Sequence, residues 1–203
     1  MSVKAEYDST ADRYDHRWGR YIDMTNTWAA EMIEPVPQAT IVDAGCGTGA
    51  LLSRLHSRCP QARLVGADFS LPMLKIAQRE LDPNVSLVAG AVDALPLAAD
   101  SVNVLVSVSV LHFMNDPQAA LSHWNRIIAP GGQLVIVDWC ADYWPTWLID
   151  GYLRLQRRHD GRAPSVETAQ RMIVQAGFSD VLTQRRRLNW AWELMRLWAV
   201  KAQ

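Results

Sequence analysis

The sequence holds few features of a secreted, metal-binding or membrane-spanning protein. Its 203 residues include three cysteines, Cys46, Cys59 and Cys140, which are too widely spaced for a disulfide framework or a paired metal-ligand motif. No apolar run approaches the roughly 20 residues of a membrane span. Residues 1–15 are polar and charged, which argues against a secretory signal. We therefore expect a cytoplasmic protein with three reduced thiols, no membrane span and no metal site.

An excess of charge of either sign is also missing. Twenty Lys and Arg residues oppose 21 Asp and Glu residues, so the formal net charge is −1. No overall field then draws the chain to nucleic acid or to an anionic membrane, which argues against a nucleic-acid partner. The sequence shows no internal repeat and no low-complexity stretch, and its length suits one domain over residues 1–203.

From Thr40 onward, short apolar runs alternate with longer amphipathic ones, which is typical of a parallel sheet covered by helices. Five strands are expected in this region: Thr40–Ala44, Arg63–Asp68, Val85–Gly90, Val102–Val108 and Gln133–Asp138. Helices are expected at Ala50–Arg58, after the N-cap Ser70, at Pro117–Ile128, at Trp144–His159 and from Pro164 to Gly177. Two further segments, Asp180–Arg187 and Trp192–Lys201, read as an antiparallel hairpin, although the second would also suit a helix.

The predicted fold class is therefore α/β, with a single doubly wound, Rossmann-like domain. Its mostly parallel seven-stranded sheet ends in an antiparallel C-terminal hairpin. Residues 1–36 are expected to form a helical cover, because Ser9 and Asp12 resemble a capping box. Three aromatic residues follow at helical spacing: Tyr14, Trp18 and Tyr21.

A glycine-rich turn links the first strand to the first helix of the sheet region. It reads Asp43-Ala44-Gly45-Cys46-Gly47-Thr48-Gly49, and glycines at such a turn let a ligand lie directly against the backbone. Nucleotide and dinucleotide sites also use glycine turns. The spacing here is Gly-x-Gly-x-Gly, which differs from the Gly-x-Gly-x-x-Gly of a dinucleotide fingerprint. Asp43, two residues before the first glycine, could anchor the loop or meet an ammonium group of the ligand.

Acidic residues also end the next two strands. Asp68 lies about twenty residues past the turn, where doubly wound folds place a carboxylate that binds ribose hydroxyls. Asp93, after the third strand, could accept a hydrogen bond from an adenine amino group. Taken singly, either could be a surface acid. Ligands bind outside the carboxyl ends of such strands, so three acids at successive strand ends predict one binding site.

These residues closely resemble the class I S-adenosylmethionine-dependent methyltransferases, and within them the small-molecule branch that includes the ubiquinone- and menaquinone-biosynthesis enzymes. The resemblance runs from about Tyr7 to the C-terminus. Val42 to Gly49 look like the first motif of that family, and Pro130-Gly131-Gly132 looks like the turn before its fifth strand. The resemblance implies S-adenosyl-L-methionine as cofactor and S-adenosyl-L-homocysteine as product. The cofactor-binding residues that it implies are Tyr14, Asp43, Ala44, Gly45, Gly47, Asp68, Phe69, Met73, Asp93, Ala94 and Ser107.

The sequence departs from the family after the fourth strand. The family often reads Leu-His-His there, whereas this chain reads Leu111-His112-Phe113. His112 is the first candidate for a general base, because an unperturbed imidazole titrates near pH 6.5. It could equally form part of a wall. Asp138, at the end of the fifth strand, is the second catalytic candidate, with an orienting or capping role as its alternative. Methyl transfer can proceed largely by proximity and orientation, so a base is not obligatory.

Acceptor selection is expected in a short substrate-covering insertion, residues 139–164, together with the N-terminal helix. Aromatic residues there could wall a pocket for a small organic acceptor: Trp18, Trp139, Tyr143, Trp144 and Trp147. Arg154, Arg157, Arg158 and Arg162 could hold an acidic group on the acceptor, or form a solvated face.

Other functions stay open on the sequence alone. A nicotinamide-dependent oxidoreductase shares the fold class, but the glycine spacing argues against it. A protein methyltransferase, or a non-catalytic domain that binds S-adenosylmethionine as a partner or sensor, would carry the same turn. The neutral charge and the lack of an appended recognition domain argue against RNA as substrate. The sequence identifies neither the methylated atom nor the oligomeric state.

Overall fold

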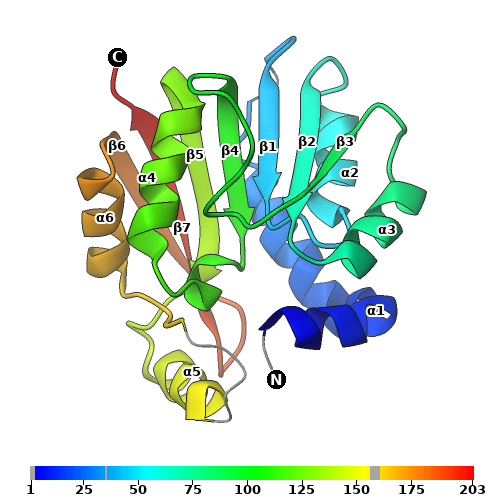
Figure 1. Cartoon of the computed structure of the whole chain (residues 1–203). Helices are drawn as coiled ribbons and strands as arrows, with labels where there is room; N and C mark the ends of the chain where they lie inside the picture. The colour runs from blue at the N-terminus through cyan, green and yellow to red at the C-terminus, as the bar shows by residue number, and fades with distance from the viewer. Residues whose placement is uncertain (1–2, 35, 156–160) are drawn as a thin grey trace.

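A computed structural model describes residues 3–34, 36–155 and 161–203. They form a three-layer α/β domain around a seven-stranded sheet in the order β3-β2-β1-β4-β5-β7-β6 (Figure 1). The strands are β1 (Thr40–Ala44), β2 (Arg63–Asp68), β3 (Ser86–Ala89), β4 (Val102–Val108), β5 (Ile128–Trp139), β6 (Phe178–Arg187) and β7 (Glu193–Lys201). Strands β1 to β5 are parallel, and β7 runs antiparallel to both β5 and β6. The predicted fold class is confirmed.

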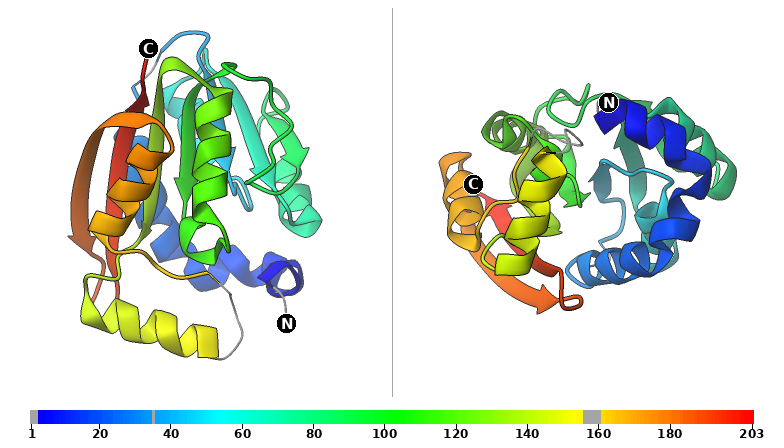
Figure 2. Two further views of the ribbon diagram at one scale, coloured as in Figure 1. Left: turned by 60° about the vertical axis from the view of Figure 1, so that its left-hand side comes forward. Right: turned by 90° about the horizontal axis from the view of Figure 1, so that it is seen from below.

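Helices cover both faces of the sheet. One face packs against α1 (Val3–Ala30), α2 (Ala50–Arg58) and α3 (Leu71–Glu80), and the other against α4 (Pro117–Ile127) and α6 (Val166–Gln175). The two layers are seen from the side in Figure 2. A 3-10 turn, η1 (Leu111–Phe113), follows β4, and α5 (Trp144–Leu155) follows β5. No helix of the described residues is long and apolar enough to cross a membrane.

The central strands are buried on both faces, as their near-continuous apolar sequences predict. Val104 and Val106 of β4 pack in the cluster beneath α1, α2 and α3. Val102 and Leu105 of the same strand pack beneath α4 and α6. Helix starts follow capping chemistry, because the side chains of Ser70, Asp116 and Ser165 accept hydrogen bonds from backbone amides of the first turn of α3, α4 and α6.

Several element bounds differ from the sequence-based prediction, by one or two residues in β3, β6 and β7. Helix α1 begins at Val3, so Ser9 lies inside it and does not cap it. Strand β5 begins at Ile128, before the glycines expected to precede it, because Ile128 already pairs with Val102. The register then shifts, and Gly131 takes a φ of 73° within this irregularity. Helix α5 is described to Leu155, so the rest of the predicted Trp144–His159 helix lies outside the described residues.

The topology fixes where a ligand can bind. The chain runs from β1 outward through β2 to β3, and then returns to place β4 on the other side of β1. This reversal opens a crevice at the carboxyl ends of β1 and β4, which is where open α/β sheets bind ligands. Helix α1 and helix α5 flank that end of the sheet, as the view from below in Figure 2 shows.

Candidate active site

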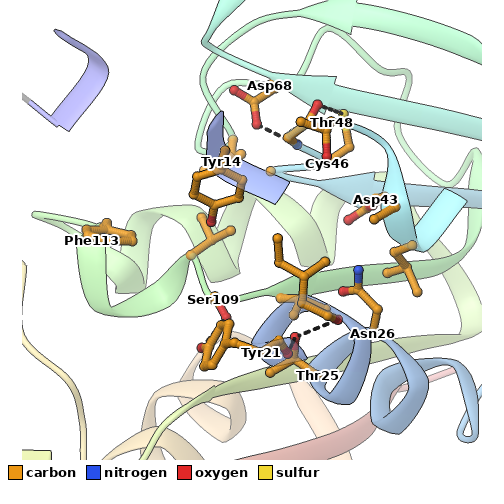
Figure 3. Close-up of a pocket in the computed structure, with 18 of the residues that line it drawn as sticks. Tyr14, Tyr21, Thr25, Asn26, Asp43, Cys46, Thr48, Asp68, Ser109 and Phe113 are labelled. Atoms are coloured by element: carbon orange, nitrogen blue, oxygen red, sulfur yellow. Dashed lines mark hydrogen bonds between the residues drawn. The ribbon is translucent and has the colours of Figure 1, made fainter. Parts of the chain in front are cut away.

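A cavity of about 790 Å³, including space open to solvent, lies at the carboxyl ends of β1, β2 and β4. The glycine turn forms one wall, and the middle of α1 forms another (Figure 3). The residues that line it are Tyr14, Tyr21, Ile22, Thr25, Asn26, Asp43, Gly45, Cys46, Gly47, Thr48, Ala50, Leu51, Asp68, Phe69, Val92, Val108, Ser109, Val110 and Phe113.

The three glycines of the turn all adopt left-handed backbone conformations. Their φ angles are 89° at Gly45, 53° at Gly47 and 88° at Gly49. Residues with a Cβ atom rarely take such angles, which explains the Gly-x-Gly-x-Gly spacing. The amides of Gly45 and Cys46 both donate to the carbonyl of Ala67, at 2.8 and 3.0 Å, and thereby tie the turn to β2.

Asp68 holds the same turn from the end of β2. Its Oδ2 accepts a hydrogen bond from the amide of Gly47 at 2.9 Å, and its Oδ1 accepts one from the amide of Ser70 at 2.8 Å. Figure 3 shows the carboxylate beside the turn. The carboxylate thus stands in the cavity wall with its orientation set by two backbone amides.

The cavity has an acidic character. Asp43 and Asp68 are the two carboxylates among its lining residues, and none of the lining residues in the described chain is Lys or Arg. Asp43 is only 2% exposed. Burial, aided by repulsion from Asp68, raises the pKa of Asp43 to about 8. A cation in the cavity would relieve this cost, whereas a diphosphate would add to the repulsion.

Helix α1 is fastened over the cavity by hydrogen bonds to three loops. Thr48 Oγ1 donates to Asp15 Oδ1 at 2.9 Å, and Ser70 Oγ donates to Asp8 Oδ1 at 2.6 Å. The Tyr21 hydroxyl lies 2.6 Å from Ser109 Oγ. The helix therefore covers the crevice through polar contacts to the loops after β1, β2 and β4, while Trp28, Ala29 and Ala30 at its end pack in the apolar core.

Asp138 organises the loop after β4. Its Oδ2 accepts hydrogen bonds from the amides of Val110 and Leu111, at 2.9 and 2.7 Å. Its Oδ1 accepts one from the amide of Trp139 at 2.7 Å and lies 2.5 Å from His112 Nδ1. Because its partners are three backbone amides and one imidazole, this fully buried carboxylate holds η1 in place.

His112 lies behind the cavity wall. It is 1% exposed, and its ring stacks on that of Trp139 with centroids 3.9 Å apart and planes 11° apart. The neighbouring residue Phe113 lines the cavity, whereas His112 and Asp138 do not. These contacts favour the wall and orienting roles over general-base chemistry for the two residues.

The structure brings about half of the expected cofactor residues together. Tyr14, Asp43, Gly45, Gly47, Asp68 and Phe69 line the cavity. Ala44 and Met73 are buried in the core, and Asp93 and Ala94 are exposed. Ser107 is buried and donates from Oγ to the carbonyl of Ala44 at 3.0 Å, so it supports β1 from behind.

The expected acceptor residues do not line this cavity. Trp139 is buried against His112, and Tyr143 donates from its hydroxyl to the carbonyl of Trp190 at 2.9 Å. Trp18 is 37% exposed on α1. Trp144 and Trp147, on α5, are 68% and 56% exposed.

Sequence reasoning did not assign several residues to the site. Those from α1 are Tyr21, Ile22, Thr25 and Asn26, and those from the loop after β4 include Ser109 and Val110. Tyr21 carried a signal, because it continued the helical spacing of Tyr14 and Trp18. The small polar residues carried none, since Thr25 and Asn26 look like ordinary helix positions until α1 is laid across the sheet.

Comparisons with known proteins agree with this architecture. The methyltransferase domain family matches residues 42–136. A malonyl-[acyl-carrier protein] O-methyltransferase of Hahella chejuensis is 31% identical, over 66% of this chain and 48% of the relative. A ubiquinone/menaquinone biosynthesis C-methyltransferase of Syntrophotalea carbinolica is 30% identical, over 59% of this chain and 51% of the relative. The chain thus spans about half the length of these curated relatives.

A solved structure shares nearly the whole fold. It is described as a complex between the Haloferax volcanii Trm112 methyltransferase activator and a putative methyltransferase. The TM-score is 0.84 at 20% identity, with 98% of each chain covered. This likeness extends the fold beyond residues 42–136, to α1 and to the C-terminal hairpin.

Proposed function

Because this chain belongs to the class I S-adenosylmethionine-dependent methyltransferases, we propose that it transfers the methyl group of that cofactor to a small organic acceptor. The observation that carries the proposal is the acidic cavity. It combines a turn whose glycines adopt the left-handed backbone conformation with two carboxylates at the ends of neighbouring strands. Bound there, S-adenosylmethionine supplies an electrophilic methyl carbon on a positively charged sulfur.

The residues present suit that cofactor better than a dinucleotide. Asp68, and Asp43 once a cation ionises it, favour a ligand that carries a sulfonium and an ammonium group. The diphosphate of a nicotinamide cofactor would meet no Lys or Arg among the lining residues of the described chain. Asp68, oriented by the amides of Gly47 and Ser70, would receive ribose hydroxyls. Phe69 and Val92 offer apolar contacts for an adenine ring.

Further contacts are part of the same proposal. Tyr14 would close over the amino-acid end of the cofactor from α1. Asp93 and Ala94 would meet the adenine edge, which requires their exposed loop to move toward the cavity. Ala44, Met73 and Ser107 would act through the shape of the wall, since they pack behind it.

We propose that the protein accelerates transfer by orientation and exclusion of water. The lining residues of the described chain include no His and no Lys. Burial raises the pKa of Tyr21 well above its usual range, so this phenol stays protonated. Tyr21, Ser109 and Phe113 can position an acceptor, and well-oriented reactants gain much of the needed rate without a base.

The helices beside the cavity favour a small acceptor. Residues 1–36 and 139–164 would cover the acceptor from the two sides of the cavity, since α1 and α5 flank its end of the sheet (Figure 2). Two curated relatives are named for malonyl-[acyl-carrier protein] and for ubiquinone/menaquinone biosynthesis, which makes carboxylic acids and quinones the first acceptor classes to test. A protein acceptor, or a non-catalytic sensor of the cofactor, is the alternative.

Isothermal titration with S-adenosylmethionine, S-adenosylhomocysteine and NAD⁺ tests the donor site. We expect micromolar-range binding of the first two, about −8 kcal/mol, and none of NAD⁺; the opposite order would overturn the proposal. A radiolabelled-methyl assay then tests quinones, thioesters and small carboxylic acids against peptides. Label in peptides alone would favour the protein acceptor, and tight cofactor binding without turnover on any panel would favour the sensor.

A further inference from the structure

Helix α5 turns large apolar side chains toward solvent. Trp144 is 68% exposed, Trp147 56%, Leu148 48%, Tyr152 60% and Leu155 81%. These positions recur at intervals of three and four residues, so they form one stripe along the helix. Stray exposed apolar residues are common on proteins, but a continuous stripe with two tryptophans is not.

The inner side of the same helix carries two buried polar residues beside Pro145 and the partly buried Leu153. Thr146 is fully buried, where its Oγ1 donates to the carbonyl of Ala191 at 3.2 Å and accepts from the amide of Glu193 at 2.9 Å. Asp150, one turn later, is 2% exposed. An ordinary surface helix turns its largest apolar side chains inward, whereas here both tryptophans point to solvent. The two tryptophans of α5 therefore do not contribute to the hydrophobic core of this domain.

The turn between β6 and β7 extends the apolar stripe. Trp190, in this turn, is 80% exposed. Its carbonyl accepts the hydrogen bond of the Tyr143 hydroxyl, at 2.9 Å, which joins the turn to the start of α5. We call this surface the α5 face; it consists of Trp144, Trp147, Leu148, Tyr152, Leu155 and Trp190. In Figure 1 α5 stands apart below the sheet, at the end where the cavity lies.

Arginines border the α5 face. Arg154 lies on α5 itself, the exposed Arg162 follows it, and Arg187 is exposed at the end of β6. The neighbouring Arg186 lies over the Trp28 ring of α1 instead, at 5.7 Å from the ring centre. The guanidinium of Arg187 lies 4.7 Å from the centre of the Tyr143 ring, which places it beside α5. Of the nearby acids, Glu193 is buried and paired with Arg185, and Asp150 is buried. Asp142, just before α5, is exposed and accepts a hydrogen bond from the amide of Val166 at 3.0 Å. The exposed charge here is mainly positive, although the chain as a whole carries −1.

We propose that the α5 face docks this protein on an anionic lipid surface. Trp and Tyr side chains favour the boundary between headgroups and acyl chains, and leucines beside them enter the apolar layer. The arginine border complements anionic headgroups. A second copy of the chain fits less well, because a symmetric contact would bring the arginine border against itself. The twelve-residue helix is about 18 Å long, so it lies in the surface and does not cross it.

Vesicle co-sedimentation of the full chain tests this proposal. The vesicles contain phosphatidylcholine, either alone or with about 30% phosphatidylglycerol, a content that gives a strongly negative surface. We expect binding to the anionic vesicles and at least several-fold weaker binding to the neutral ones. The triple variant Trp144→Ala, Trp147→Ala, Leu155→Ala should lose at least tenfold in the partition coefficient. These side chains are exposed and line no part of the cavity, so stabilisation by S-adenosylmethionine should match that of the wild type.

A matched control removes equally exposed apolar side chains elsewhere. Val174 on α6 is 56% exposed and Leu182 on β6 is 59% exposed, and their replacement by Ala should leave vesicle binding unchanged. The pair Arg162→Gln, Arg187→Gln should lower the preference for anionic vesicles. The proposal is overturned if the wild type binds neither vesicle, or if the triple variant binds as well as the wild type. A wild-type dimer that the triple variant abolishes, without lipid, would also overturn it and assign the face to a second copy.

Discussion

The indole nitrogen of Trp139 donates a hydrogen bond to the hydroxyl of Tyr21 at 3.0 Å, across 118 positions of the chain. The same hydroxyl meets Ser109 Oγ at 2.6 Å. One phenol thus joins α1 to the ends of β4 and β5. Since Trp139 also stacks on His112, the contact links the N-terminal helix to the loop that Asp138 organises.

Replacement of Tyr21 by Phe should loosen α1 from the sheet. The buried Trp139 N–H and the Ser109 hydroxyl would lose their partner, which costs about 1–3 kcal/mol. For a domain of this size that lowers Tm by roughly 2–4 °C per kcal/mol. Cofactor affinity should fall as well, because Tyr21 lines the cavity. Tyr152→Phe is the control: its side chain is 60% exposed, and Tm should stay nearly constant. Equal Tm values for the two variants would contradict the link.

The buried carboxyl of Asp43 predicts an unusual pH dependence. Its pKa is about 8 in the folded, ligand-free protein, against about 3.9 for an unfolded Asp. Folding therefore takes up a proton between these pH values. This contribution to stability is complete below about pH 4 and is lost as pH rises to about 8, by at most about 1.4 kcal/mol per pH unit. Thermal denaturation should show a falling Tm from pH 5 to 8.

The variant Asp43→Asn should flatten that curve, because it removes the titrating group. Binding of a cationic cofactor should also release a proton from Asp43 at pH 7. Calorimetry in buffers of different ionisation enthalpy measures this release directly. A Tm profile that is the same for wild type and variant, with no buffer dependence of the binding heat, would mean that Asp43 is already ionised in the empty cavity.

Two alanine substitutions in the glycine turn separate folding from binding. A Cβ atom at Gly45 would lie 2.4 Å from Val110 Cγ2, whereas one at Gly47 would meet nothing within 4 Å. Both positions have positive φ, so each alanine costs about 1–2 kcal/mol, and Gly45→Ala adds the clash. Gly47 lines the cavity, so its added methyl group would occupy ligand space.

We therefore expect Gly47→Ala to remain folded and to bind S-adenosylmethionine at least tenfold more weakly, as measured by calorimetry. Gly45→Ala should show the larger fall in Tm. Wild-type cofactor affinity in the Gly47→Ala variant would mean that the ligand does not lie against the turn.

Asp138→Asn should destabilise the protein without abolishing cofactor binding. The amide side chain replaces one acceptor oxygen by a donor that faces backbone N–H groups, so a buried network is broken, at a cost of about 3–5 kcal/mol. Asp100→Asn is the control, since that carboxylate is 54% exposed and pairs with Lys201 on the surface. If Asp138 instead acts as a base, the variant would lose activity while its Tm stayed near that of the wild type.

The periodic part of the sequence predicted most of the fold. Val102–Val108 and Arg63–Asp68 match the observed strands residue for residue, because a buried parallel strand has a long β-branched or apolar run and clear ends. Ser70 correctly marked the start of α3, because a serine side chain caps the first turn of the helix. Strand hydrophobicity and helix capping depend on residues close in sequence, so the sequence alone reveals them.

Features that depend on contacts between residues distant in sequence could not be predicted in this way. Ile128 reads as the end of a helix, but pairing with Val102 makes it the start of β5. The cavity residues Thr25 and Asn26 lie on a helix whose path depends on hydrogen bonds such as Asp15 to Thr48. Trp144 and Trp147 read as pocket aromatics, yet buried Thr146 turns α5 so that both face solvent. In each instance a tertiary contact, absent from any window of sequence, decided the outcome.

The insertion of β7 between β5 and β6 has a consequence for synthesis of the chain on the ribosome. Strand β5 is complete at Trp139, but the partner for its open edge is formed by residues 193–201. While residues 140–192 emerge, the apolar edge that holds Val135 and Val137 has no strand to pair with. An unpaired edge of this kind favours association with other chains. Nascent chains stalled shortly before Glu193 should therefore be the ones that chaperones hold longest.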